Sequence, residues 1–227
     1  MRPDLPDRRE FIYEPPQLEP IEILHIDDAF LCVNKPADLL SVPGRTENLA
    51  DCLIARLHLQ YPEALLVHRL DVATSGVMVF ARTREAQRHL GLQFEKRFTE
   101  KTYIAQVYGH TLDSGHINLP LRADWPERPR QMVCLEHGKS AQTDWVKLND
   151  NQSSSRLSLH PITGRSHQLR VHMWAMGHPI LGDRIYAPDE AFRAAPRLCL
   201  HAESLTLRHP NGGKPITITT PCPNFGL

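Results

Sequence analysis

Residues 68–76 read His68-Arg69-Leu70-Asp71-Val72-Ala73-Thr74-Ser75-Gly76. Two short apolar runs flank them, Leu65–Val67 and Gly76–Arg82, and both have the composition of strands. The polar residues therefore form a turn between rigid elements, where functional side chains are often presented. Asp71 follows Arg69 by two residues, and a neighbouring cation keeps a carboxylate ionised. An ionised carboxylate can act as a nucleophile or a base.

The same string also has a purely structural interpretation. A turn Asp commonly caps backbone amides together with nearby hydroxyl groups, and Thr74 and Ser75 supply two hydroxyls here. Taken alone, the string leaves both interpretations open.

The patterning of the rest of the chain predicts many strands and few helices. Helices are expected at Ala50–Gln60, Arg84–Phe98 and His167–Met176, the last with Ser166 as its N-cap. Because strands and helices do not alternate strictly, the pattern predicts an α+β fold with a largely antiparallel sheet. The other expected strands are Ile21–His25, Phe30–Asn34, Thr102–Tyr108, His116–Leu121, Ala141–Leu148, Arg156–His160, Leu198–Leu207 and Ile216–Thr219.

Composition places the chain among globular proteins. It has 227 residues, 41% hydrophobic and 23% charged, with a formal net charge of zero. Residues 1–20 are polar and rich in proline, so we expect an extended acidic tail followed by one domain over residues 21–227. Eight acids and three bases lie in residues 1–30, which leaves the rest of the chain, residues 31–227, moderately basic. This charge is compatible with a phosphate-rich partner but does not require one.

Five scattered cysteines, at 32, 52, 134, 199 and 222, include no pair at CxxC spacing. This argues against a disulfide framework and against a zinc site, and it favours a reducing compartment. The apolar runs are strand-sized, and no apolar segment follows the basic residues at the N-terminus. We therefore expect a cytoplasmic protein without a membrane span or a bound metal.

A second polar segment runs from Gly164 to His172. On the expected helix, His167 and Arg170 are i, i+3 neighbours and Arg165 lies at the N-terminal end. A helix N-terminus with two arginines suits a phosphate or a carboxylate. Solvated arginines beside partly buried histidines would explain the segment equally well.

Two further segments carry weaker signals. On the strand beginning at Lys101, the side chains of Lys101, Tyr103 and Ala105 point to one face. A tyrosine there is often part of the core or its rim, but it can also stack on a nucleobase. Another loop, from Val33 to Gly44, contains a single cation, Lys35.

Together and in this order, these segments resemble the pseudouridine synthases of the RluA type. The resemblance covers residues 20–220 and implies the pseudouridine synthase catalytic fold, a mixed and largely antiparallel sheet flanked by a few helices. His68–Gly76 matches the family string HRLDxxTSG throughout. The other matches are Asn34-Lys35-Pro36 with Leu39–Gly44 to NKPxGLLSVPG, Tyr103 to the active-site tyrosine, Gly164–His172 to GRxHQLRxH, and Leu200-His201-Ala202 to a late LHA strand.

The chain departs from the family pattern at Asp38, where the family has a glycine that tolerates positive φ better than Asp does. The N-terminal S4-like RNA-binding domain of many relatives is also not expected here. Residues 124–131 resemble the short, dual-specificity RluA branch. That branch modifies an anticodon-loop uridine of tRNA and a hairpin uridine of 23S rRNA.

The resemblance implies an isomerase that acts on RNA without a cofactor or a metal. The target uridine is flipped out of its helix, cleaved at N1–C1′, rotated and rejoined through C5. Asp71 would start the cleavage, Arg170 would pair with Asp71, and Tyr103 would stack on the uracil. Contacts to RNA would come from Arg69 as a wedge, Arg165 and Lys35 as phosphate ligands, and His68.

Three alternatives remain open. The same chemistry could act on another rRNA or tRNA uridine, or the fold could serve as a non-catalytic RNA-binding module. A hydrolase could use Ser75, His68 and Asp71, although the sequence has no GxSxG elbow. We expect a monomer in each case.

Overall fold

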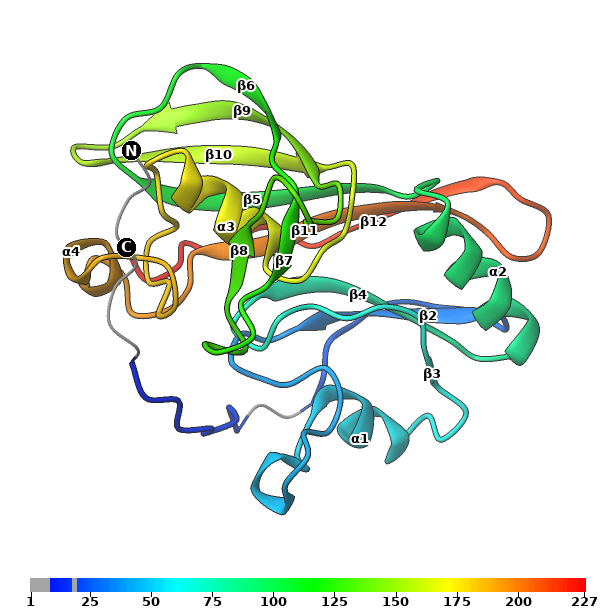
Figure 1. The fold of residues 1–227 in the computed structure, drawn as a ribbon. Helices are drawn as coiled ribbons and strands as arrows, with labels where there is room; N and C mark the ends of the chain where they lie inside the picture. The colour runs from blue at the N-terminus through cyan, green and yellow to red at the C-terminus, as the bar shows by residue number, and fades with distance from the viewer. Residues whose placement is uncertain (1–8, 18–19) are drawn as a thin grey trace. The chain divides into compact units, whose positions relative to one another are not determined.

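A computed structural model describes residues 9–17 and 20–227 of the chain (Figure 1). These residues form two compact units. We call one the Asp71 unit, which comprises Phe11–Lys101 and His201–Cys222, apart from residues 18–19. The other is the Arg170 unit, Thr102–Leu200 with residues 9–10 and Pro223–Leu227. The expectation of a single domain from residue 21 stays a prediction.

The Asp71 unit is built on strands that pair antiparallel with one exception. β2 (Phe30–Lys35) pairs with β1 (Ile23–Ile26) on one side and β4 (Ser75–Ala81) on the other. The exception is β11 (Leu200–Arg208), which runs parallel to β4. The remaining elements are β3 (Leu65–Leu66) beside β4, β12 (Pro215–Thr219) beside β11, η1 (Glu47–Leu49), α1 (Leu53–His58) and α2 (Arg84–Glu95).

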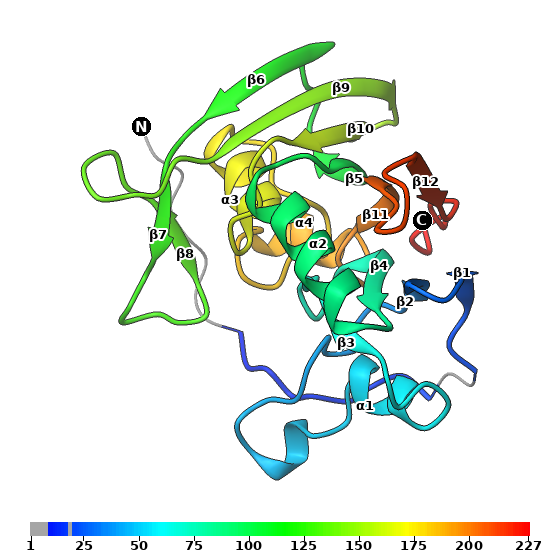
Figure 2. The same cartoon turned by 90° about the vertical axis from the view of Figure 1, so that its right-hand side faces the viewer.

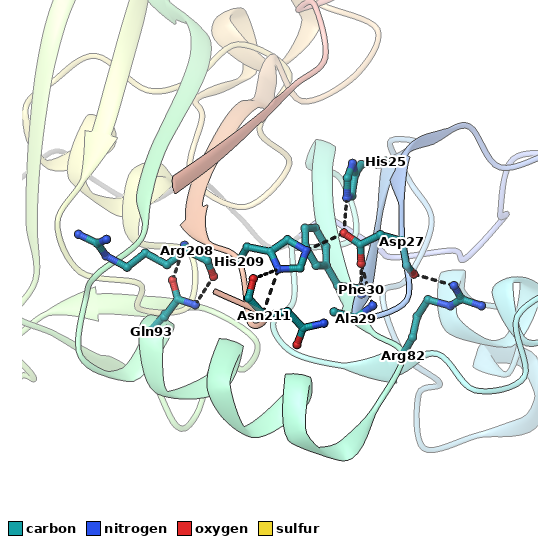
Figure 3. Close-up of polar contacts among 9 residues, drawn as sticks. All are labelled: His25, Asp27, Ala29, Phe30, Arg82, Gln93, Arg208, His209 and Asn211. Carbon is teal, nitrogen blue, oxygen red and sulfur yellow. Dashed lines mark hydrogen bonds and ion pairs between the residues drawn. The ribbon is translucent and has the colours of Figure 1, made fainter. Parts of the chain in front are cut away.

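The core of this unit lies between the sheet and α2. All seven residues of β4 are buried, as expected for a continuous apolar strand covered on both faces. Leu90 of α2 packs in one cluster with Val79 of β4 and Leu205 of β11. The Gln93 amide exchanges two hydrogen bonds with the Arg208 backbone, at 2.8 and 2.7 Å, which ties α2 to β11 (Figure 3).

The Asp27 carboxylate holds the β1–β2 turn at one end of this sheet (Figure 3). Its Oδ1 accepts the backbone N–H groups of Ala29 and Phe30 at 2.7 and 3.0 Å. Its Oδ2 lies 2.8 Å from Nε2 of His25 and 2.8 Å from Nε2 of His209. Burial would raise the pKa of Asp27, but the hydrogen bonds outweigh burial and hold that pKa well below its usual range.

We expect Asp27→Asn to lower the free energy of unfolding by about 1–3 kcal/mol at neutral pH, because charged hydrogen bonds are lost. The folded-state pKa lies below the unfolded value of about 3.9, so this stabilisation is present above about pH 4 and disappears as pH falls through the folded pKa. Urea unfolding at neutral pH and near pH 3 measures it, with the exposed Asp28→Asn as control. Equal destabilisation at both pH values would contradict the assignment.

The Arg170 unit contains a second antiparallel set of strands, in the order β5 (Glu100–Tyr108), β10 (Ser154–Pro161), β9 (Gln142–Asp150) and β6 (Ser114–Asn118). A small ribbon of β7 (Leu121–Ala123) and β8 (Gln131–Val133) stands apart from them (Figure 2). α3 (Gln168–Ala175) packs on this ribbon through Val171 and Trp174. The last helix is α4 (Asp189–Arg193).

The expected α+β class is confirmed: within the described residues, the strand pairs named above are antiparallel apart from β4 with β11, and the helices are few. The β7–β8 ribbon and α4 were not anticipated. The expected N-cap, Ser166, is wrong. α3 begins at Gln168, and His167 is its N-cap in a left-handed conformation with φ 53° and no side-chain cap bond. The first residue of the helix, Gln168, turns its side chain back and accepts the N–H of Arg165 at 3.0 Å.

Residues 9–17 contain no helix or strand, and side chains fix them in place. Arg9 donates to the carbonyl oxygens of Arg184 and Ala187 at 3.0 Å each. Tyr13 donates to the carbonyl of Asp51 at 2.7 Å. The rest of the expected tail, residues 1–8 and 18–19, lies outside the described residues. No helix in the described part of the chain is both long and apolar enough to cross a bilayer.

Candidate active site

The turn at Asp71 is a tight loop between β3 and β4. The Asp71 carbonyl accepts the N–H of Thr74 at 3.1 Å, which closes the turn over Val72 and Ala73. Asp71 is partly buried and Arg69 is exposed. The turn therefore keeps Arg69 at the surface and leaves the Asp71 side chain partly accessible.

Ser41 holds the residue immediately before Asp71. Its buried hydroxyl donates to the carbonyl of Leu70 at 2.7 Å and accepts the Leu70 N–H at 3.3 Å. Both polar groups of the Leu70 backbone are thus fixed by one side chain from the loop after β2. The position of Asp71 depends on this loop, which belongs to the 34–44 segment.

Lys35 is not the phosphate ligand that we predicted. Its side chain is fully buried, and its ammonium group donates to the carbonyls of Pro36, Leu39 and Val72 at 2.8, 2.7 and 3.0 Å. An ammonium group has three protons to donate, and these bonds point all of them into the protein. Lys35 is instead a positioning residue that anchors Val72, the neighbour of Asp71.

The loop that Lys35 binds contains Asp38, the position where the family has glycine. Asp38 adopts positive φ, 61°. Among residues other than glycine, Asp tolerates this left-handed region better than most. The loop therefore keeps the backbone shape that a glycine would favour.

We expect Lys35→Met to lower the free energy of unfolding by about 2–4 kcal/mol, because three carbonyls lose the charged donor of a fully buried side chain. Urea denaturation measures the loss, and the exposed Lys214→Met is the matched control. A loss below about 0.5 kcal/mol, typical of a surface lysine, would show that these bonds contribute little.

Ser75 forms a buried hydrogen bond with His201. The Ser75 hydroxyl lies 2.8 Å from Nδ1 of His201, whose Nε2 lies 3.1 Å from the carbonyl of Thr220. A carbonyl only accepts, so Nε2 carries the proton and Nδ1 accepts from Ser75. Ser75 and His201 are 5% and 1% exposed. The hydrolase alternative, which needs Ser75 reachable and next to His68, is wrong.

Gly76 has no room for a side chain. Its φ is +116°, and a Cβ built there would lie 2.2 Å from the carbonyl oxygen of Ala202 on β11. The glycine is required because the parallel strand approaches its backbone so closely.

We expect Gly76→Ala to lower the free energy of unfolding by more than about 2 kcal/mol, through strain at positive φ and the clash with β11. Chemical denaturation, or soluble yield if folding fails, measures it. The control is Gly91→Ala in α2, where a Cβ meets no atom within 4 Å and helix propensity favours alanine. A Gly76→Ala protein as stable as the control would refute the steric argument.

His68 supports the turn from beneath and does not act as a cation. Its Nε2 accepts the N–H of Val79 at 3.1 Å, and its ring stacks on Phe94 with centroids 4.5 Å apart. Burial, assisted by the charge of Lys101, lowers the pKa of His68 to about 3. The ring is therefore neutral and supports the turn, and the predicted contact of His68 with RNA stays a prediction.

In the Arg170 unit, Arg170 forms a bidentate ion pair with Asp183. Nε and Nη2 each lie 2.7 Å from one Asp183 oxygen, and the two residues are 4% and 1% exposed. Burial would raise the pKa of Asp183, but the Arg170 charge and the hydrogen bonds lower it further, so the carboxylate stays ionised. Asp183 was not predicted, because the sequence marks it only as an acid that follows a glycine. The pairing of Arg170 with Asp71 stays a prediction.

Tyr186 completes the support of Arg170. The Arg170 guanidinium carbon lies 5.2 Å from the centre of the fully buried Tyr186 ring. The Tyr186 hydroxyl accepts the N–H of Gln131 at 2.8 Å and lies 2.8 Å from Nδ1 of His167. Ring and carboxylate together hold the planar guanidinium in one orientation.

The remaining predicted residues of this unit are Tyr103 and Arg165. Tyr103 lies on β5 opposite Leu159 and is partly buried. Arg165 precedes α3, and its Nε donates to the carbonyl of Ser140 at 3.0 Å. Stacking of Tyr103 on a base and binding of phosphate by Arg165 stay predictions. Among the described residues, no cluster of three or more His, Cys, Asp or Glu side chains could hold a metal.

Comparison with known proteins gives a consistent result. The family model described as RNA pseudouridylate synthase matches residues 29–175. The chain is 53% identical over 213 residues to the dual-specificity RNA pseudouridine synthase RluA of Escherichia coli K12, which covers 92% of this chain and 96% of that protein. It is 54% identical over 196 residues to the protein of the same name from Yersinia pestis, with 86% and 95% covered.

Solved structures agree with the sequence comparisons. The human RNA Pseudouridylate Synthase Domain Containing 1 protein is 30% identical with a TM-score of 0.74, over 92% of this chain and 86% of that one. The human Domain Containing 4 protein is 25% identical with a TM-score of 0.71, over 90% and 89%. With the HRLDxxTSG turn held between two strands and the family model covering most of the chain, this protein belongs to the RNA pseudouridylate synthase family, enzymes that isomerise uridine to pseudouridine in RNA.

Proposed function

We propose that this protein is a dual-specificity enzyme that modifies an anticodon-loop uridine of tRNA and a hairpin uridine of 23S rRNA. The observation that carries the proposal is the 53% identity to the dual-specificity enzyme of Escherichia coli over nearly the full length of both chains. Residues 124–131, which resemble that branch, fall inside the aligned region. We also propose that the enzyme acts as a monomer and that it is located in the cytosol. The five free cysteines support the location, because thiols stay reduced in the cytosol.

The chemistry that we propose starts from Asp71. The uridine is flipped out of its stem-loop, and the Asp71 carboxylate initiates cleavage of the N1–C1′ bond. The freed uracil rotates and C5 bonds to C1′, after which the C5 proton leaves and N1 holds a proton. The reaction is an isomerisation, so no atom is gained or lost overall.

The other residues have supporting roles in this proposal. Tyr103 stacks on the uracil and helps to remove the C5 proton. Because the ordinary pKa of a tyrosine is about 10, this second role requires surroundings that make the phenol a better base. Arg170, oriented by Asp183 and Tyr186, supplies the cation that keeps Asp71 ionised. Arg69 fills the RNA stack that the uridine leaves.

The test is carbodiimide mapping of pseudouridine in total tRNA and 23S rRNA, from cells with and without this protein. We expect one tRNA anticodon-loop site and one 23S rRNA hairpin site to disappear together and return on complementation. Loss in only one RNA class would refute dual specificity. Loss at unrelated uridines would support the same chemistry on another target.

A further inference from the structure

The turn that follows α2 and leads into the first two residues of β5, which together form residues 96–101, has an unusual shape and composition. α2 ends at Glu95 with Lys96 as its C-cap, and Arg97 then takes the left-handed conformation with φ 62°. The N–H of Phe98 reaches back to the carbonyl of Gln93 at 2.8 Å, the bond that closes a helix end. Glycine usually occupies the left-handed position, so the chain carries an arginine there at some cost in stability.

This turn directs an aromatic ring into solvent. Phe98 is 64% exposed, and Lys96 and Arg97 precede it directly. A single exposed apolar side chain is common in soluble proteins, so Phe98 alone indicates nothing. Its significance comes from the cations around it.

Lys101, at the end of the same turn, is a partly buried cation without a counter-ion. Among residues 9–17 and 20–227, its ammonium group forms no ion pair and no hydrogen bond with another described residue. Burial, with the charge of Arg97 added, lowers the pKa of Lys101 to about 8. Lys101 also acts electrostatically on the neutral ring of His68. Desolvating an unpaired ammonium destabilises the fold.

The neighbouring cations are unpaired as well. In the described part of the chain, Arg69, Lys96 and Arg97 have no ion-pair partner, and the nearby acids Glu95 and Glu100 form none either. Elsewhere in the Asp71 unit, Arg56 is paired with Asp51 and Arg82 with Glu63. An unpaired group of cations beside an exposed aromatic ring is the composition of a surface that binds single-stranded nucleic acid.

This turn lies next to the catalytic segment. His68 stacks on Phe94 of α2 and interacts electrostatically with Lys101. His68 is followed directly by Arg69 and, three residues on, by Asp71. All of these residues belong to the Asp71 unit.

We propose that residues 96–101 form a second RNA contact, which binds the strand flanking the flipped uridine. Arg97 and Lys101 each neutralise a backbone phosphate, and Phe98 stacks on an unpaired base. This proposal rests on the proposed function, because it takes the RNA stem-loop as its occupant. It assigns to substrate recognition three residues, Arg97, Phe98 and Lys101, to which the family resemblance gives no role.

The test measures RNA affinity and protein stability in the same variants. A fluorescently labelled anticodon stem-loop is titrated by anisotropy against Asp71→Asn protein, which prevents turnover, alone and with Lys101→Met, Arg97→Gln or Phe98→Ala added. We expect each cation variant to bind several-fold more weakly and to lower the slope of log K against log salt by about 0.7–1. We expect Phe98→Ala to lose about 5- to 150-fold in affinity, with Phe98→Trp retaining it.

Stability separates binding from a structural role. Lys101→Met removes a desolvated charge, so we expect its melting temperature to rise while its affinity for RNA falls. A structural lysine would show the reverse change in melting temperature. Affinity of the parent protein should also fall between about pH 7 and 9 as Lys101 loses its proton, whereas Lys101→Met should change less. Lys214→Met and Leu59→Ala, exposed residues of the same unit, are the controls.

The outcomes distinguish this inference from the proposed function. If the parent protein does not bind the stem-loop at all, the proposed function fails. If the parent binds and the Lys101, Arg97 and Phe98 variants match the controls in affinity and salt slope, only the second RNA contact is refuted. Weaker binding that follows a fall in melting temperature would also refute it.

Discussion

Replacing Asp71 with Asn is expected to reduce pseudouridine formation by at least about a thousand-fold, or about 4 kcal/mol in activation free energy. The amide has nearly the same shape as the carboxylate but cannot start glycosidic cleavage, because it carries no negative charge. Tritium release from RNA labelled at uracil C5 measures turnover directly. The same substitution should leave the fold intact, since the turn is held by Ser41, Lys35 and backbone bonds.

The control for this experiment is Asp28→Asn, which removes an exposed acid from the same unit. It should keep turnover close to the parent rate. Stem-loop affinity of Asp71→Asn should also stay close to the parent value, which would place the loss in chemistry and not in binding. Turnover above about a tenth of the parent rate would remove Asp71 from its role.

Breaking the Arg170–Asp183 pair is expected to have the second large effect. Asp183→Ala removes the bidentate carboxylate that binds the buried Arg170 guanidinium, which should lower the free energy of unfolding by about 3–5 kcal/mol. Urea unfolding measures this loss. The control is Asp113→Ala, which removes a 96% exposed partner of Lys147 and should cost less than about 1 kcal/mol.

A double substitution tests whether the charge itself is responsible. Combining Asp183→Leu with Arg170→Met removes both charges, so it should restore much of the lost stability. That double variant should nevertheless remain inactive, because the proposed cation beside Asp71 is gone. Arg170→Ala should likewise lose far more activity than Arg165→Ala, and equal mild losses would contradict the pairing of Arg170 with Asp71.

Most of the local structure could be predicted because it depends on neighbouring residues. Short apolar and alternating runs predicted β2, β4 and β5 within one or two residues, since side-chain period alone decides which face of a strand is buried. The short strands β7 and β8 were missed, since three residues carry too little periodicity to detect. The His68–Gly76 string predicted the turn that carries Asp71 because a motif is a local pattern of residues.

The sequence by itself determined the fold class, the family and the position of the Asp71 turn. Tertiary structure alone decided what the charged and polar residues around it do. Lys35 carries the charge that a phosphate ligand needs, yet its ammonium group donates to three carbonyls inside the protein. One of these carbonyls belongs to Val72, 37 residues away. His201 reaches Ser75 across 126 residues. Hydrogen bonds and ion pairs join groups that chain folding brings together, so no local pattern states whether a cation faces solvent or a carbonyl.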